Sequence, residues 1–289
     1  MAFTSEDGNP STSPGTEGVV YLNSGTFVHK ALYATATTGN VIISPLCDCS
    51  WITTTTVDAT SQAEFTAAIA TDNTTVKLAE NTTYTLPSTI GENVVIEGGE
   101  GTVVDLSSKT YSGLDNVVFK NLTIKEDTGN YNGIQHSDYI YYENCNIEGV
   151  LWIYSTNTFF NKCTFSNTAN AYNAWLYGGG KAVFTDCEFK NEYNRALLIY
   201  NESALEYDVT VSGCNFTANQ TTSDKAAIQL HTDYGIHGSL TINNSSATGY
   251  NDQSGTGQLW SEVYNNPNPI EKAYNFDVIV DGVKVQSAQ

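Results

Sequence analysis

Aromatic residues recur at one place in five short apolar segments of this chain. Alternate residues of a β-strand point to opposite faces of its sheet. If each segment is a strand, one face is almost wholly aliphatic and suits the interior of a fold, whereas the other carries Trp152 and Trp175 beside a column of Tyr and His side chains. The five segments are Gly133–His136, Leu151–Tyr154, Ala174–Tyr177, Leu197–Tyr200 and Ile228–His231, with Gln258–Ser261 as a weaker sixth.

The alternation assigns each position of these segments to one face. Trp and Tyr dominate interface hot spots, and a contiguous exposed patch normally marks a contact surface. The predicted interior set is Gly133, Leu151, Ala174, Leu197 and Ile228 with Gln135, Ile153, Leu176, Ile199 and Leu230. The predicted outward set adds Ile134, Leu198 and Gln229 to the candidate binding or interface residues, which are His136, Trp152, Tyr154, Trp175, Tyr177, Tyr200 and His231.

Three interpretations of the outward face remain open. It is a symmetric contact between copies of the chain, with a trimer favoured, or a platform on which sugar rings stack. The third interpretation is a face that the chain's own loops cover, notably residues 250 to 270. A register shift of one residue would exchange the two faces, but it would crowd Trp152 and Trp175 into the interior.

Four cysteines share one position of a repeated pattern: Cys145, Cys163, Cys187 and Cys214. Neighbouring strands lie about 4.8 Å apart, so we expect the thiols to form an inward ladder. A linear ladder does not offer the tetrahedral thiolate set that zinc prefers, whereas free cysteine often packs as a small apolar side chain. We expect no metal and no other cofactor. Cys47 and Cys49 lie in an expected loop without partner ligands.

Residues able to support catalysis are few. Arg195 is the only arginine, and Lys181 and Lys190 are its nearest basic neighbours in the repeats. No adjacent pair of Asp residues is present, and glycoside hydrolysis needs paired carboxyl groups. No EF-hand-like calcium loop occurs either. We therefore expect a protein that is not an enzyme. The acids of the repeats include Asp138, Glu143, Asp186, Glu188, Glu192, Asp224 and Asp233.

The composition restricts the possible partners. The 289 residues include 12 Lys and Arg against 31 Asp and Glu, a formal net charge of −19. Such a surface repels phosphate backbones, anionic membranes and polyanionic substrates, so we expect no nucleic-acid partner. No apolar run is long enough to span a membrane, so we expect no membrane insertion. The N-terminus lacks the positive start and apolar stretch of a signal peptide.

The elements that position these residues repeat along the chain. Each unit reads as a short alternating strand, a polar turn residue and a second short strand, and the cysteine position recurs at 122, 145, 163, 187, 214 and 245. Repeats of about 20 to 30 residues indicate stacked units with one shared core. Strand-and-turn units predict a parallel β-helix. The segments are Asn116–Ile124, Tyr139–Ile147, Thr158–Phe165, Lys181–Phe189, Asp208–Phe216, Ser239–Ala247 and Phe276–Val285.

One short amphipathic helix is expected within Val57–Ala70. Ser61 and Glu64 form a capping box, and Phe65 and Ile69 lie on one face. We divide the chain into an N-terminal leader and anchor segment, residues 1–56, and a β-helix domain, residues 57–289. The abundant Asn residues, many in Asn-x-Ser/Thr sequences, are expected to act as turn residues and to bond along the stack.

The Val-x-Phe-x-Asn/Asp-Cys-x-Phe repeat resembles the pectate-lyase-like right-handed parallel β-helix superfamily, and the helix before it resembles the N-terminal cap of that superfamily. The resemblance covers roughly residues 57 to 285 and implies an all-β, single-stranded solenoid of about eight coils. It does not assign a function, because the superfamily includes lyases, polygalacturonases, adhesins and phage tailspikes. Of the polygalacturonase catalytic segments, only Gly235–Gly238 is a loose echo.

A short non-helical N-terminal region ahead of a β-helix is similar to phage fibre and spike proteins. We therefore expect a structural, surface-projecting virion protein, a head or tail fibre or a capsid decoration, that contacts host glycans. The N-terminal segment would bind other virion proteins, and the chain would form a homo-oligomer. The alternatives are a polysaccharide lyase or glycoside hydrolase of this fold and a bacterial surface adhesin, secreted or held at the cell surface.

Overall fold

The computed structural model describes residues 55–106, 109–127, 132–192, 194–218, 225–232, 234–250, 257–263 and 275–288, together with the backbone of three strands nearer the N-terminus. The chain divides into two compact units, Met1–Thr53 and Thr54–Gln289. In the first unit, β1 (Val19–Val20), β2 (Leu32–Thr37) and β3 (Asn40–Ser44) form an antiparallel sheet in the order β1-β2-β3. The predicted loop with Cys47 and Cys49 lies outside the described residues.

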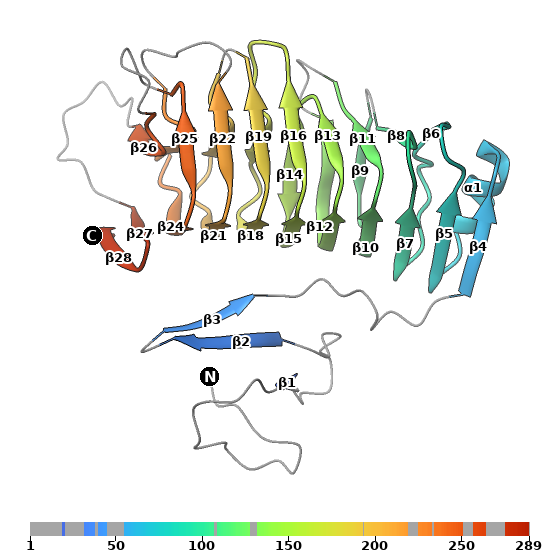
Figure 1. Cartoon of the computed structure of the whole chain (residues 1–289), viewed down its shortest axis with the longest axis horizontal. Coiled ribbons are helices and arrows are strands. Elements are labelled where there is room, and N and C mark those ends of the chain that lie inside the picture. The colour runs from blue at the N-terminus through green and yellow to red at the C-terminus, as the bar shows by residue number, and fades with distance from the viewer. Residues whose placement is uncertain are drawn as a thin grey trace. The chain divides into compact units, whose positions relative to one another are not determined.

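The second unit is built from three stacks of parallel strands, here called sheets I, II and III (Figure 1). A coil is one passage of the chain through sheet III, sheet I and sheet II in turn. Sheet I contains β4 (Thr55–Ala59), β5 (Thr74–Leu78), β7 (Val94–Glu97), β10 (Asp115–Lys120), β12 (Asn132–Glu143), β15 (Asn157–Asn161), β18 (Gly180–Thr185), β21 (Glu206–Ser212), β24 (His237–Asn243), β27 (Phe276–Val280) and the antiparallel β28 (Val283–Gln286).

Sheets II and III complete each coil. Sheet II contains β6 (Thr83–Thr85), β8 (Val103–Asp105), β11 (Thr123–Lys125), β13 (Asn146–Glu148), β16 (Thr164–Asn167), β19 (Glu188–Asn191), β22 (Asn215–Ala218) and β25 (Ser246–Thr248). Sheet III contains β9 (Thr110–Ser112), the first part of β12, β14 (Leu151–Ser155), β17 (Ala174–Leu176), β20 (Leu197–Tyr200), β23 (Ile228–His231) and β26 (Trp260–Val263). Because β12 pairs in both, sheets I and III form one 17-stranded sheet. This curled, parallel, all-β arrangement is compatible with the predicted β-helix.

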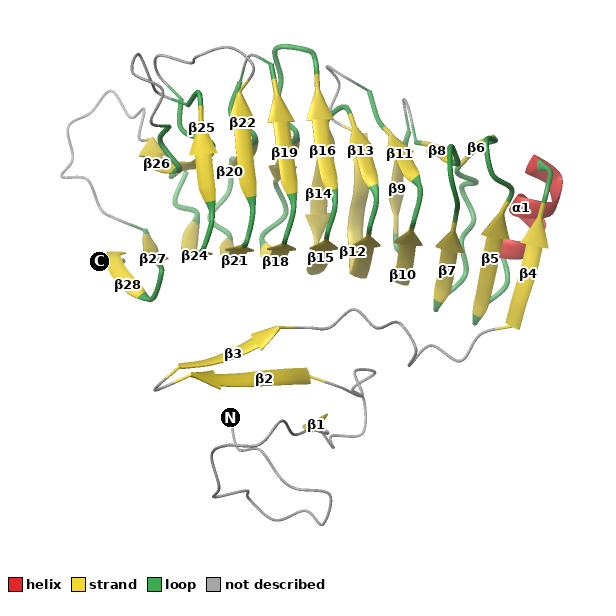
Figure 2. Ribbon diagram, viewed as in Figure 1, coloured by secondary structure: helices red, strands yellow, loops and turns green. Residues whose placement is uncertain are grey.

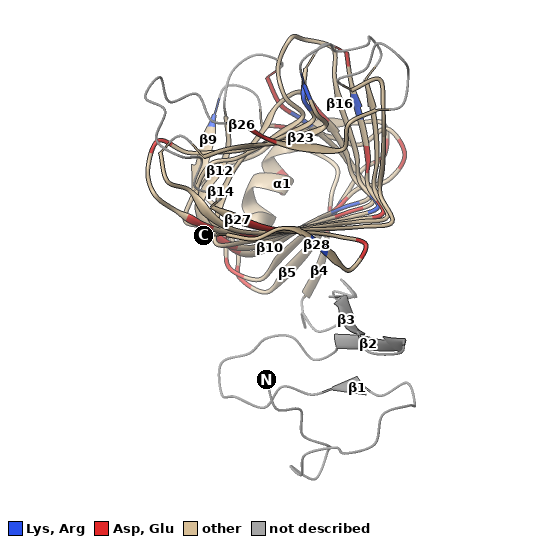
Figure 3. Cartoon of the chain, turned by 90° about the vertical axis from the view of Figure 1, so that its left-hand side faces the viewer, with Lys and Arg blue, Asp and Glu red and all other residues tan. Residues whose placement is uncertain are grey.

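The predicted helix is confirmed and lies at the β4 end of the stack (Figure 2). Helix α1 spans Gln62–Ile69, and Ser61 and Glu64 form both halves of the capping box. Its buried side chains include Phe65, whose ring meets Tyr84 edge-on at 5.3 Å. Viewed along the stack, α1 crosses the opening that the three sheets enclose (Figure 3). The helix therefore covers apolar side chains of the first coils.

In-register stacking places like side chains above one another in the core. Phe119, Tyr142, Phe160 and Phe184 stack through sheet I with ring centroids 5.2, 4.7 and 4.7 Å apart. A second interior stack joins Phe165, Phe189 and Phe216 through sheet II at 4.4 and 4.5 Å. Such aromatic pairs contribute about 0.5–1.5 kcal/mol each beyond their area burial. The repeated Phe of the sequence is thus an interior contact between coils.

Each coil from β10 onward turns from sheet I into sheet II through a corner of two residues. The first corner residue adopts a left-handed φ between 46° and 65°, a conformation that suits Asn, Asp and Gly. The coil-to-coil hydrogen bonds continue through the corner, as in Asn144 N to Asn161 O and Thr164 N to Cys145 O, both 2.9 Å. The first corner residues are Asn121, Asn144, Lys162, Asp186, Gly213 and Asn244.

Asparagine side chains bond along the stack, as expected. At the corner, Asn144 Nδ2 donates to Asn121 Oδ1 at 2.9 Å. At the start of sheet I, Asn93 Nδ2 donates to Asn73 Oδ1 at 3.1 Å, and Asn116 Nδ2 donates to Asn93 Oδ1. Asn73, Asn93 and Asn116 also have left-handed φ values. Asparagine therefore serves both the turn and the contact between coils.

The second corner residue points inward, and this position holds the cysteine column. Cys145, Cys163, Cys187 and Cys214 are free and at most 2% exposed, which confirms the predicted inward ladder. Their thiols donate to carbonyls of the preceding coil, for example Cys145 Sγ to Phe119 O at 3.3 Å. Burial raises the pKa of Cys163 and of Cys187 well above the ordinary value; that of Cys214 is raised first by its hydrogen bond with Cys187 and then by burial.

We predict that these four thiols are inert in the folded protein, because burial suppresses the reactive thiolate. Iodoacetamide labelling followed by peptide mapping should find them unmodified in native buffer and modified in denaturant. Cys163→Ala should lower the free energy of unfolding by roughly 1–2 kcal/mol, since only a small cavity forms. Fast native labelling of the four, or stoichiometric zinc in the purified protein, would contradict the packing role.

Candidate functional site

The outer face of sheet III carries the predicted aromatic residues. Trp152 and Tyr154 are half-buried, whereas the alternating Leu151 and Ile153 are at most 5% exposed and belong to the core. Backbone pairing places Trp152 beside Trp175 and Tyr200 beside His231 on adjacent strands. The predicted register is therefore confirmed for β14, β17, β20 and β23. We call His136, Trp152, Tyr154, Tyr172, Trp175, Tyr177, Tyr200, His231 and Tyr234 the aromatic face.

The rings of the aromatic face form one continuous set of contacts. Trp152 stacks with Trp175 at 6.0 Å, and Trp175 stacks with Tyr200 at 6.1 Å. Tyr177 meets Trp152 and Trp175 edge-on at 5.2 and 5.1 Å. Trp175 Nε1 also donates to Tyr200 O at 3.1 Å. These contacts hold the rings of three consecutive coils in a fixed arrangement.

The ring orientation decides what the face offers to a partner. Trp175 stacks on a ring of the preceding coil and on a ring of the following coil, with interplanar angles of 28° and 20°. Its two flat faces are thus turned along the stack, towards Trp152 and Tyr200. A sugar platform needs an open ring face, whereas packing against another protein surface can use ring edges. The stacking favours a protein contact over sugar stacking at Trp175.

The face is less exposed than the sequence predicts. Of the predicted residues only His136 is exposed, and the other six side chains are half-buried. Tyr234, which the sequence analysis did not name, is also exposed. In the same outward row, Leu198 and Gln229 are each 2% exposed. Leu198 and Gln229 are therefore covered in the folded chain, and most of residues 250 to 270, to which the third interpretation assigns the cover, lie outside the described residues.

The predicted faces are wrong in β12. Ile134 pairs with Ile153 and is a core residue at 2% exposure, whereas Gln135 pairs with the outward Tyr154. An irregularity between Gln135 and Ser137 inserts His136, whose φ is 45°. The inserted residue moves the alternation by one position. His136 still reaches the aromatic face, because its ring lies 4.3 Å from that of Tyr154.

The sixth predicted strand is also displaced. Trp260, rather than Gln258, pairs with Ile228, so the described strand β26 begins two residues later than expected. Trp260 therefore occupies the inward column, where it packs partly buried against the core. The connection before β26 is longer than those before the other strands of sheet III, so the repeat spacing does not predict where β26 begins.

A glycine shapes the surface around Tyr154. A Cβ atom at Gly178 would lie 1.8 Å from Tyr154 Cδ2, so the Tyr154 ring occupies the space of the missing side chain. Tyr154 also meets Tyr177 edge-on at 5.8 Å. Gly178 is therefore part of the aromatic face, although its sequence context shows only a turn residue.

Two carboxylates that are distant in sequence become neighbours beside this face. Asp115 and Asp138 pair in register on β10 and β12. Burial and the charge of Asp138 raise the pKa of Asp115, and burial followed by the charge of Asp138 raises the pKa of Tyr139. Asp138 Oδ1 accepts from Asn157 Nδ2 at 2.7 Å and from Tyr139 N at 2.9 Å. The sequence shows no adjacent pair, because the two acids are 23 positions apart, one full coil of the stack.

The basic residues named as catalytic candidates are already engaged. The Arg195 guanidinium lies 5.3 Å from the Tyr172 ring centroid, and the Tyr172 ring meets Trp175 edge-on at 6.0 Å. Lys190 Nζ lies 2.9 Å from Glu188 Oε2, and Lys181 Nζ lies 4.0 Å from Asp208 Oδ2. These contacts place Arg195 at the border of the aromatic face rather than beside the Asp115–Asp138 pair.

A second outward row, on sheet I, was not anticipated. Its members alternate with core residues yet are at most 9% exposed: Val95, Val118, Tyr141, Phe159 and Val183. The row follows from β7 to β18, and the half-buried Thr210 and Thr241 continue it in β21 and β24. Continuous apolar runs are typical of strands covered on both faces. Val117-Val118-Phe119 and Phe159-Phe160 are such runs, so the signal was present in the sequence.

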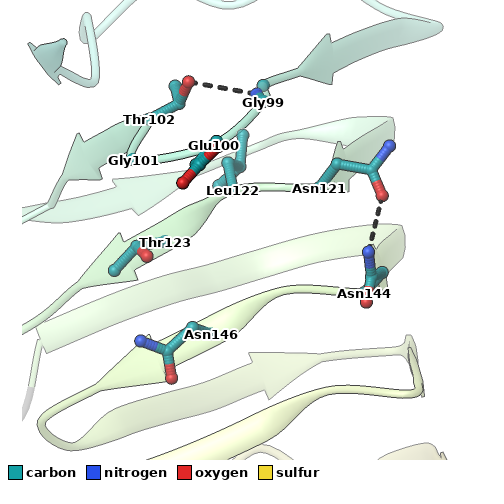
Figure 4. A pocket seen from close by; sticks show the side chains of 10 residues that line it. Gly99, Glu100, Gly101, Thr102, Asn121, Leu122, Thr123, Asn144 and Asn146 are labelled. Atoms are coloured by element: carbon teal, nitrogen blue, oxygen red, sulfur yellow. Dashed lines mark hydrogen bonds between the residues drawn. The ribbon is translucent and has the colours of Figure 1, made fainter. Parts of the chain in front are cut away.

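The outside of sheet II holds an open pocket of about 460 Å³ (Figure 4). Its lining includes Glu100, Thr102, Asn121, Asn144 and Asn146. Gly99 N donates to Thr102 Oγ1 at 3.0 Å, and the Asn144–Asn121 bond crosses the same lining. Apart from Glu100, the named lining side chains are a hydroxyl and amides, so the pocket offers one carboxylate without a second catalytic group beside it.

Two absences are established for the described part of the chain. No three His, Cys, Asp or Glu residues in it are grouped so that they could hold a metal ion. None of its helices is long and apolar enough to cross a membrane.

Comparison with known proteins gives no relative to argue from. No family model, no curated protein sequence and no solved structure matches this chain.

We predict that Trp175→Ala lowers the oligomeric mass measured by sedimentation equilibrium while the β-rich circular dichroism persists. Removal of this side chain opens the centre of the ring set that would form the contact between copies. Phe189→Leu is the control, because it removes an interior ring and should reduce stability without changing the mass. An unchanged mass together with lost glycan retention would instead identify a sugar platform.

Proposed function

We propose that the chain is a structural, surface-projecting protein of a phage particle, a fibre, spike or decoration. In this proposal the second unit is a right-handed parallel β-helix that projects from an attachment unit at the N-terminus. The division into Met1–Thr53 and Thr54–Gln289 supports it, since attachment and projection would belong to separate bodies. The coil-to-coil bonding supports it as well, because stacked coils yield an extended and rigid element.

The aromatic face is the observation that carries the proposal. It is a preformed set of rings, most of them half-buried before any partner binds, and its ring edges suit packing against protein. We propose that it is the contact between copies of the chain, with a trimer favoured. A host glycan would then be contacted elsewhere on the assembled spike or at the open margin of the face near His136 and Tyr234.

The proposal predicts where antibodies reach the protein on intact particles. Antibodies against residues 57–289 should decorate particles in electron micrographs, because the projecting domain lies outside. Antibodies against residues 1–53 should bind only after disruption, because the attachment unit is covered. Particles whose proteome, by mass spectrometry, lacks the chain would refute a virion role and favour a bacterial adhesin.

A second candidate function is a polysaccharide-active enzyme, and the Asp115–Asp138 pair is the observation that favours it. Two carboxyl groups on adjacent strands, one with a raised pKa, are the elements of acid and base catalysis on glycosides. Asp138 also lies on β12, the strand that carries His136 to the aromatic face. Few other residues could support catalysis, because the basic candidates Arg195, Lys181 and Lys190 are engaged elsewhere, so this function stays second.

A substrate screen separates the two functions. With pectate, alginate and neutral glycans we expect no new reducing ends and no unsaturated product. If turnover is found, Asp138→Asn should abolish it, since that change removes one carboxylate of the pair. Asp208→Asn is the matched control, because Asp208 is an exposed acid on sheet I. Loss of turnover in Arg195→Ala or Lys190→Ala would also make the enzyme the first choice.

A further inference from the structure

A second open pocket, of about 620 Å³, lies at the end of the stack opposite α1. The strands at this end are β26, β27 and β28 (Figure 1). Helix α1 covers the other end, whereas no helix of the described residues covers this one. The pocket is lined in part by Gln258, Leu259, Trp260, Glu262, Val280 and Gln286.

Two interior columns of sheet III change character at this pocket. Ile228 and Leu230 of β23 pair with Trp260 and Glu262, so β26 places a ring and a carboxyl group where the preceding coils have aliphatic side chains. Among the described strands, β26 is the last of sheet III. Trp260 packs against the core yet stays half-buried. A carboxyl group is unfavourable as the end of an apolar core, whereas a ring beside a carboxylate suits a binding pocket.

The Trp260 ring differs from the rings of the aromatic face. Trp175 is stacked on both sides, by Trp152 and by Tyr200. Trp260 lines an open pocket, and within the described part of the chain no aromatic ring stacks on it. A sugar that stacks on a ring needs ring surface that other rings do not occupy. Trp260 meets this requirement better than Trp175 does.

Glu262 is held in place beside this ring. Gln286 Nε2 donates to Glu262 Oε2 at 2.9 Å and to Phe276 O at 3.2 Å, so the amide ties the carboxylate to the backbone of sheet I. Glu262 Oε1 makes no well-formed hydrogen bond and is shielded from water. An acceptor in that state is unfavourable, and water does not supply the missing donor. The carboxylate therefore favours a ligand whose hydroxyl group inserts beside it.

The backbone of the pocket is fitted closely to the preceding coil. Ile228 N donates to Leu259 O at 2.9 Å. A Cβ atom at Gly257, where φ is 74°, would lie 2.1 Å from Ala247 O, so this part of the wall accepts no side chain. A wall that is already ordered lowers the entropic cost of binding.

The charge of the pocket restricts the ligand. Of its described lining residues, Glu262 alone is charged. Lys284, the basic residue of β28, lies 2.9 Å from Asp277 Oδ2 and is therefore paired. A carboxylate repels uronates and other acidic sugars, but it accepts strong charge-assisted hydrogen bonds from hydroxyl groups. The class that fits is an uncharged, hydroxyl-rich ring.

We propose that this pocket binds a neutral sugar, whose apolar ring face packs on Trp260 and whose hydroxyl groups donate to Glu262. The pocket lies at the opposite end of the stack from β4, which directly follows the junction with the first unit at Thr54. It is thus the place where a projecting protein would meet a host glycan. That role in host contact rests on the proposed function, whereas the binding itself does not.

Glycan retention by the full chain tests the site. Immobilised neutral oligosaccharides of glucose, galactose and N-acetylhexosamines should include one that retains the chain, whereas pectate and alginate should not retain it. Trp260→Ala should weaken retention about tenfold or more, because the stacking surface is lost. Glu262→Gln should also weaken it, because the charged acceptor is lost. Val285→Thr is the control, since Val285 is 52% exposed on β28 outside the lining, and it should bind like the wild type.

Tryptophan fluorescence keeps the test decisive if Trp260→Ala folds poorly. The retained oligosaccharide should change the emission of the wild type. Trp260→Phe keeps a ring to pack against the core, so its circular dichroism should stay β-rich, but the emission change should disappear and retention should weaken.

Three results would overturn the proposal. The first is a wild-type chain that no neutral oligosaccharide retains. The second is wild-type affinity in both Trp260→Phe and Glu262→Gln. The third is retention that Trp175→Ala abolishes while the Trp260 variants keep it, which would move the sugar site to the aromatic face. None of the three bears on the virion role, which mass spectrometry of particles tests separately.

Discussion

The structure depends on backbone hydrogen bonds between consecutive coils. Each parallel strand satisfies its amides and carbonyls with the coils before and after it, and the bonding continues through the sheet I to sheet II corners. The consequence is strict register, so that each position meets its counterpart in the next coil about 4.8 Å away. Columns of Phe, Cys, Asn and Trp follow from this constraint. Aromatic rings stack on one another, asparagine side chains form hydrogen bonds with one another, and cysteines pack together.

The same constraint makes a misfit in a column costly. An interior position has neighbours above and below at fixed distance, so an unsuitable group cannot move along the stack to find a partner. Asn191 meets this demand with bonds to Ala171 O and Asn173 Oδ1. Glu126, which follows β11 and is 3% exposed, is an exception, because neither of its carboxyl oxygens makes a well-formed hydrogen bond. Residues whose side chains do not suit their column are thus the positions at which a function can be sought.

Much of the fold could be predicted because its signals are local. The capping box at Ser61 and the alternation in β14 and β20 each lie within a few residues, and the cysteine position recurs once in each of four successive coils. The His136 bulge was not predictable from alternation, since one extra residue leaves no separate mark in the sequence. The right hand of the solenoid rests on resemblance alone and remains a proposal.

The candidate site was predictable in part for a related reason. The alternation in β14, β17 and β20 identifies which Trp and Tyr side chains point outward. It does not show how the rings stack, and that stacking decides between ring faces and ring edges as the contact. The Asp115–Asp138 pair needs the register between coils, which follows only from the three-dimensional pairing.

The coil corners differ in how much variation in length they accept. Between β10 and β25, every passage from sheet I to sheet II uses two residues, whereas passages from sheet II to sheet III range from two residues, between β13 and β14, to nine, between β22 and β23. The corner of constant length keeps the coils in register, whereas the connection of variable length accepts insertions. New peptide segments could therefore be displayed along that edge, coil by coil, without disturbing the columns inside.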